Sequence, residues 1–402
     1  MFRKVLILTA IIIMFLACEL QADVTHSMWV GGEQGEWGQA SNWDPARVPD
    51  NSSWRTYDVT IDSNSIGIDE ITVGLQQSRT IDQLDCYGEV GLVKWTSDWV
   101  ELILVDSSGL TNHGYLEIVG FVIEGNVTNT AGATLELEDM EIVGNLYNQA
   151  GATIEVFEVS DEVLVEGDVE NAGSMTITPV SKLSVHNVEG STLHNTGQIN
   201  IYGGGCVVSD DILDNNDTGV IQGFGVVFGD QLRNKGQIYA YGGSLAVSSE
   251  GPLLNSGVLA NYPLSSLHIK SATDVNNLGT IEVNAGGGVA FDCNLVNEPN
   301  ETISLLGGTL AAKTVTQSAG ATFQGFGGIT GNVVINPNGI IKLTGPTNIV
   351  GNVNIPENAR LEISDGTTLI TGHTTNNGDI RVVNGAVVFQ GGYSGSGLVQ
   401  KD

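Results

Sequence analysis

The sequence predicts an all-β chain that folds as a single-stranded parallel β-helix, or β-solenoid, with about 20 residues per coil. Three observations carry this prediction. A motif of the form Asn-x-Gly-x-aliphatic-x-aliphatic recurs along most of the chain, apolar and polar residues alternate beside it, and 53 of the 402 residues are Gly. No helical periodicity accompanies them, so the expected unit is a coil of short strands joined by tight turns.

Residues 1–22 have the pattern of an export signal. Arg3 and Lys4 precede an apolar run over residues 5–17, which is shorter than the roughly 20 residues that span a membrane. Cleavage after Ala22 would release a secreted chain. A second hypothesis makes Cys18 a lipidated N-terminus and places the protein at the cell surface. No further apolar span follows, so no transmembrane segment is expected in the mature chain.

Residues 23–60 are predicted to form a Trp-rich N-terminal cap. All six Trp residues lie before residue 100, and the repeats that follow contain none. An open β-helix end exposes unpaired strand edges and apolar core, so it needs a cover. Sugar binding by the Trp cluster is the alternative interpretation.

Residues 61–402 are predicted to form the β-helix, with about fifteen or more coils. One copy of the motif reads Leu193-x-Asn195-x-Gly197-x-Ile199-x-Ile201. Gln317 replaces Asn in one coil, and the copies at Ile335 and Ile355 keep only the apolar frame. The Asn position recurs at Asn112, Asn129, Asn148, Asn171, Asn195, Asn215, Asn234, Asn255, Asn277, Asn297 and Asn376.

These Asn residues have a structural explanation. Asn tolerates the backbone of a bend, and its side chain can bond to nearby backbone groups. Stacked from coil to coil, each side-chain amide can pair with the one above and the one below. We therefore expect a structural ladder; a polar binding groove is the alternative.

Three acidic residues occupy one slot in successive coils: Glu117, Glu136 and Glu155. Each lies between two inward apolar residues, so the three should point outward and stack. Like charges at that spacing raise a pKa or recruit a cation, and Ca²⁺ prefers such carboxylate ligands. The alternative is a solvated acidic face that keeps the chain soluble. No cofactor other than Ca²⁺ is expected.

Four aromatic residues recur beside the first turn of successive coils: Tyr202, Phe224, Tyr241 and Tyr262. Two hypotheses remain for them, packing at a corner of the coil and a flat strip that binds glycans.

Charge and motifs exclude several classes of function. The net charge is -31, with only 15 Lys and Arg residues, which argues against nucleic acid as a partner. No nucleophile elbow, phosphate loop or Cys-His pattern occurs. Cys86, Cys206 and Cys293 are widely spaced and are expected to be small buried residues rather than a disulfide framework.

The repeats resemble those of filamentous-haemagglutinin-like and autotransporter-passenger-like secreted bacterial proteins. Trp29-Val30-Gly31-Gly32, Ser41-Asn42-Trp43 and Val48-Pro49-Asp50 are similar to the opening of such proteins. The resemblance implies a right-handed helix and an extracellular structural or adhesive role, with glycans or cell-surface components as partners. The alternative is a carbohydrate-active β-helix enzyme of the polysaccharide lyase or hydrolase type, although no catalytic residue is identified.

Overall fold

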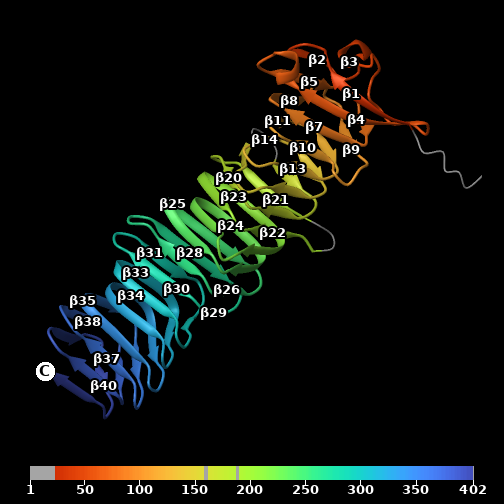
Figure 1. Ribbon diagram of the computed structural model, residues 1–402. Coiled ribbons are helices and arrows are strands. Elements are labelled where there is room, and N and C mark those ends of the chain that lie inside the picture. Colours follow the sequence, from red (N-terminus) through yellow and green to blue (C-terminus); the bar gives the residue numbers. More distant parts are fainter. Residues whose placement is uncertain (1–22, 158–161, 187–189, 402) are drawn as a thin grey trace, which may run out of the picture.

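The chain forms one elongated β-solenoid of about 16 turns, seen here in a computed structural model (Figure 1). The structure describes residues 23–157, 162–186 and 190–401. Parallel strands stack from one coil to the next along almost the whole length, which confirms the predicted fold class. The predicted signal segment 1–22, with Cys18, lies outside the described residues.

Each coil contributes strands to three faces that run along the rod, and we name them the ladder face, the second face and the third face. The ladder face contains β1 (Asp23–Trp29), β4 (Arg55–Asp62), β7 (Gln83–Tyr87), β10 (Leu110–Asn112), β13 (Val127–Asn129), β16 (Leu146–Asn148), β19 (Val169–Asn171), β22 (Thr192–Asn195), β26 (Leu253–Asn255), β29 (Val275–Asn277), β32 (Leu295–Asn297), β36 (Val353–Ile355), β39 (Thr374–Asn376) and β42 (Tyr393–Ser394).

The other two faces follow the ladder face in each coil. The second face contains β2 (Gln34–Glu36), β5 (Ile71–Leu75), β8 (Glu89–Lys94), β11 (Tyr115–Val119), β14 (Thr134–Glu138), β17 (Thr153–Phe157), β20 (Ser174–Ile177), β27 (Val258–Asn261), β30 (Thr280–Asn284), β37 (Arg360–Ile363), β40 (Asp379–Val382) and β43 (Leu398–Lys401). The third face contains β6 (Arg79–Ile81), β9 (Glu101–Leu104), β12 (Val122–Glu124), β15 (Glu141–Val143), β18 (Val163–Val165), β21 (Lys182–Val185), β28 (Ser266–Ser271), β31 (Gly288–Phe291), β38 (Thr367–Ile370) and β41 (Ala386–Phe389).

Some strands continue around a corner and belong to more than one face. They are β23 (Gln198–Asn215), β24 (Val220–Asn234), β25 (Gln237–Ser249), β33 (Thr302–Gln317), β34 (Thr322–Ile335) and β35 (Ile340–Val350). Outside the three faces lie the short strand β3 (Trp43–Asp44), the 3₁₀ turn η1 (Ala40–Asn42) and the single helical turn α2 (Ser63–Ile66).

The core runs unbroken inside the three faces. Within β14, Leu135 and Leu137 are buried while Thr134, Glu136 and Glu138 face outward, the period of two expected for a strand with one covered face. Because the next coil repeats the pattern in register, apolar side chains stack on apolar side chains from Trp29 to Val382. No single coil could bury its apolar side chains alone, so the stack itself creates the core.

Three Trp residues close the N-terminal end of this core. Trp29 and Trp37 both pack against the Trp43 ring, at centroid distances of 5.0 Å and 4.8 Å. The indole N–H of Trp43 donates to the Trp37 carbonyl, so the polar edge of the ring is satisfied although the ring is buried. The parallel stacking already includes β1 and β2, which lie within the segment predicted to form the cap.

The Gly of the repeat motif allows successive coils to approach closely. A Cβ atom on Gly257 would lie 2.0 Å from the carbonyl oxygen of Gly236 in the coil before, and one on Gly279 would lie 2.2 Å from that of Gly257. No side chain larger than hydrogen fits there without displacing backbone.

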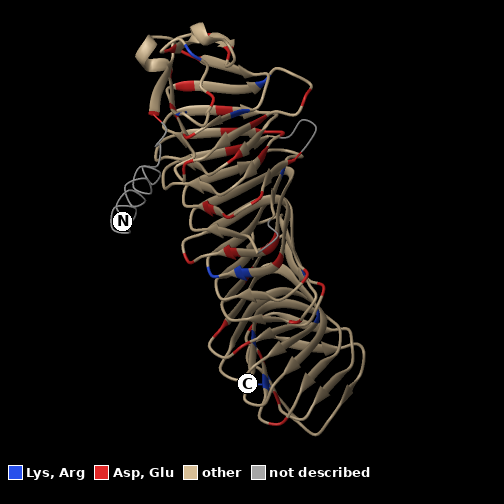
Figure 2. Cartoon of the chain, turned by 90° about the vertical axis from the view of Figure 1, so that its right-hand side faces the viewer, with Lys and Arg blue, Asp and Glu red and all other residues tan. Residues whose placement is uncertain are grey.

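The outer surface is strongly acidic. Figure 2 shows Asp and Glu residues distributed along the rod, with few Lys or Arg residues among them. No helix in the described part of the chain is long and apolar enough to cross a membrane.

Candidate functional site

The Asn side chains of the ladder face form a continuous row of hydrogen bonds inside the core. Asn112 Nδ2 donates to Asn129 Oδ1 at 2.9 Å, and Asn129 Nδ2 donates to Asn148 Oδ1 at 3.0 Å. The same bond recurs from each Asn to the next as far as Asn297, whose amide donates to Gln317 Oε1 at 3.0 Å. The residues lie 17 to 24 positions apart, so one amide comes from every coil.

Most of these amides also donate to a backbone carbonyl of the following coil. Asn255 and Gln317 donate instead to a carbonyl of their own coil. The second hydrogen on Asn129 Nδ2 reaches the carbonyl oxygen of Thr153 at 2.7 Å, and Asn112 reaches that of Thr134 at 2.7 Å. The side chains are 0–1% exposed, and their polar atoms are used within the protein. This row therefore has a structural role, and nothing in its geometry offers it to a ligand.

The row ends where the sequence departs from the motif. Ile335 and Ile355 replace the amide beyond Gln317. Asn376 stands apart from the row and donates to the Tyr393 hydroxyl at 3.0 Å. At the other end, the thiol-bearing Cys86 lies in register below Asn112.

The three predicted Ca²⁺ ligands stack in register on the outside of the second face. Glu117 pairs with Glu136, which pairs with Glu155. Partial burial raises the pKa of Glu117, and the charges of Glu136 and Glu138 raise it further. However, among the residues the structure describes, no group of three or more His, Cys, Asp or Glu side chains is arranged to hold a metal ion.

The four predicted glycan-binding aromatics lie at the corner between the second and third faces. Tyr241 and Tyr262 contact each other edge to face at a centroid distance of 5.1 Å. Tyr239, on the same strand as Tyr241, contacts Tyr262 at 5.6 Å. Within the described ranges no ring contact joins Tyr202 to Phe224 or Phe224 to Tyr241. Tyr241 and Tyr262 are about half exposed, so part of this corner offers aromatic faces to solvent.

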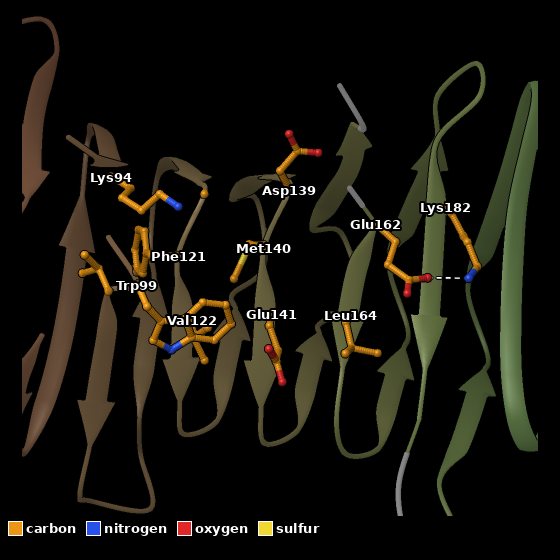
Figure 3. A pocket seen from close by; sticks show the side chains of 12 residues that line it. Lys94, Trp99, Phe121, Val122, Asp139, Met140, Glu141, Glu162, Leu164 and Lys182 are labelled. Carbon is orange, nitrogen blue, oxygen red and sulfur yellow. Dashed lines mark ion pairs between the residues drawn. The ribbon is translucent and has the colours of Figure 1, made fainter. Parts of the chain in front are cut away.

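A hollow of about 600 Å³ lies at the corner between the second and third faces, nearer the N-terminus (Figure 3). We name it the corner groove. It crosses five successive coils, because its residues lie at the ends of β8, β11 and β14 and at the starts of β9, β12, β15, β18 and β21. Phe121, Val122 and Met140 supply a buried apolar floor. Trp99 stands beside that floor with 68% of its surface exposed.

Charged groups of both signs border the corner groove. Lys94 lies at one end and Lys182 at the other, where Lys182 forms an ion pair with Glu162. Burial opposes ionisation of Glu162, but hydrogen bonds from Lys182 and Ser184 outweigh burial and lower the Glu162 pKa.

Glu141 has the opposite environment in the middle of the corner groove. Burial raises its pKa, and the nearby charges of Glu166 and Glu101 raise it further. Within the described part of the chain, neither Glu141 nor Lys94 has an ion-pair partner. Both side chains are therefore available to a polar ligand.

Sequence reasoning did not assemble the corner groove. The sequence marks Trp99 only as one of the six Trp residues before residue 100, and it does not single out Glu141. Phe121 and Met140 each follow a residue with positive φ, Gly120 and Asp139. The positive-φ residue bends the chain just after the second-face strand and turns the next side chain under the corner. No repeated sequence motif marks this bend.

No family model, curated protein or solved structure matches this chain. The structure confirms the β-solenoid repeat architecture, and the resemblance to filamentous-haemagglutinin-like and autotransporter-passenger-like proteins stays a prediction.

Proposed function

We propose that this chain is an extracellular structural and adhesive rod, secreted or held at the cell surface, that presents its long faces to glycans or other surface components. The observation that carries the proposal is the unbroken row of buried amides from Asn112 to Gln317, set in one continuous core. About 16 turns at ~4.8 Å each make a body roughly 75 Å long.

The contacts between coils explain why this body should resist bending. Every coil is bonded to its neighbours by strand pairing and, over much of the length, by a side-chain amide in the core. Bending would have to break these bonds on one side. The net charge of -31 adds repulsion between rods, which favours dispersal over clumping.

Residues 1–22 and the repeat resemblance support the location and the adhesive role. Cell fractionation of the tagged full chain tests the location, and we expect the protein in the medium or at the cell surface. Retention in the cytoplasm would contradict the proposal. Small-angle X-ray scattering on residues 23–402 tests the shape. We expect an elongated rod, and a compact globule would contradict the proposal.

A further inference from the structure

We propose that the corner groove is a binding site for a linear, uncharged oligosaccharide, with Trp99 as the platform on which one sugar ring stacks. The inference rests on the adhesive role proposed above and gives it a site and a ligand class.

The first argument is the position of Trp99. A large aromatic side chain left 68% exposed beside an apolar floor is a surface that gains from being covered. Its indole N–H donates to Glu101 Oε1 at 2.8 Å, which restrains the ring. A pyranose has an apolar face of C–H groups that packs on such a ring, so little ordering is needed on binding.

The second argument is the polar rim. Sugar hydroxyl groups at the edge of a stacked ring both donate and accept hydrogen bonds. The Glu141 carboxylate can accept them and the Lys94 ammonium can donate them, and among the described residues neither has an ion-pair partner. A few polar groups around an apolar floor are the usual composition of a small-ligand site.

Shape and charge narrow the ligand class. The corner groove crosses five coils, roughly 19 Å at ~4.8 Å per coil step, so it fits an extended chain better than a compact molecule. The net charge of -31 repels a polyanion. At the Lys94 end a cationic ligand would meet a like charge, whereas Lys182 at the other end is already paired with Glu162. An uncharged polymer meets neither penalty.

The exposed aromatic residues lie at the same corner beyond the Lys182 end of the corner groove. Lys182 pairs in register with Cys206 of the next coil, and Tyr202 lies at the corner just before Cys206. A long glycan leaving the corner groove past Lys182 would therefore meet Tyr202 and, farther along, Tyr241 and Tyr262.

The test uses residues 23–402 and calorimetric titration with neutral hexasaccharides: β-1,4-glucan, β-1,3-glucan, β-1,4-xylan and β-1,4-mannan fragments. Hexagalacturonate and hexalysine serve as the charged alternatives. We expect at least one neutral hexasaccharide to bind, and Trp99→Ala to weaken that binding about tenfold or more. Glu141→Gln, which keeps the shape but removes the charge, should weaken it less.

Trp54→Ala is the matched control, because Trp54 is 70% exposed but lies outside the corner groove. It should change the affinity by less than about twofold. Equal binding by wild type and Trp99→Ala would overturn the proposal, as would binding of hexalysine or hexagalacturonate alone, or of no probe. Scattering on the same samples reports the rod independently, so loss of the corner-groove proposal is distinguishable from loss of the rod.

Discussion

Asn277 and Asn297 are joined by their side chains across two coils: Asn277 Nδ2 donates to Asn297 Oδ1 at 2.9 Å. Asn277 Oδ1 in turn accepts from Asn255 Nδ2 at 2.9 Å. Asn276, the residue just before Asn277, lies on the same strand but faces solvent. Two consecutive Asn residues thus occupy opposite environments, and comparing them isolates the contribution of the buried row.

Asn277→Ala should destabilise the rod strongly. The substitution leaves an amide hydrogen of Asn255 and the side-chain oxygen of Asn297 buried without that partner, and each such group costs about 1–3 kcal/mol. We expect a loss of about 2–4 kcal/mol in the free energy of unfolding, measured by urea titration. Asn276→Ala should stay within about 0.5 kcal/mol. Equal effects of the two substitutions would show that the buried row contributes nothing specific.

The sequence could predict the ladder because local rules determine it. Period-two alternation fixes which side chains enter the core, and repetition after each coil brings like residues together, as with Leu135 and Ile154. The corner groove follows from no local rule. Trp99, Met140 and Lys182 have no common motif, and their relation depends on how corners of unequal length stack. The stacked Glu residues are intermediate: their register could be predicted, but the pKa of Glu117 depends on its burial.

Gly257→Ala should also destabilise the protein, for a steric reason. Its Cβ would lie 2.0 Å from a backbone oxygen of the previous coil, so the two coils must separate. We expect a cost of about 1–3 kcal/mol by urea titration, the range typical of overpacked interiors.

Gly91→Ala is the control for that substitution. Its nearest neighbour would be the Glu117 carboxylate oxygen at 3.6 Å, an ordinary contact. This change should be neutral or stabilise by about 0.4–1 kcal/mol, because Ala restricts the unfolded chain more than Gly does. If both substitutions had the same effect, close approach would not explain the repeated Gly.

The stability of the acidic stack should depend on pH through Glu117. Its pKa in the folded protein is raised above the ordinary 4.5, so the folded state binds the proton more tightly than the unfolded state. Ionisation therefore destabilises the fold, and stability should increase as the pH falls from neutral through the folded pKa toward 4.5.

Glu117→Gln isolates this effect. At pH 7 the variant should melt at a higher temperature than wild type, and the difference should shrink as the pH approaches 4.5. Glu282→Gln is the matched control, since Glu282 occupies the same outward slot between the uncharged Ala260 and Ser304. A melting difference that does not change with pH would exclude repulsion in the stack as its cause.

Cys86 should be inert to thiol reagents in the folded rod. It has no exposed surface, and burial, with a smaller contribution from the Asp85 charge, raises the thiol pKa. Because the thiolate is the reactive form, labelling requires the N-terminal coils to open. Cys206 is partly exposed, so the expectation that all three Cys residues are buried is wrong for this one, and it should react directly.

Single-cysteine variants of residues 23–402 separate these rates: Cys206→Ser with Cys293→Ser leaves Cys86, and Cys86→Ser with Cys293→Ser leaves Cys206. With a chromogenic disulfide reagent at pH 8, Cys86 should react on the order of a hundredfold more slowly, since an opening of ~3 kcal/mol must come first. In urea the two rates should converge. Comparable rates in the native state would mean that coils at the N-terminal end open readily, and that the three packed Trp rings do not seal that end of the core.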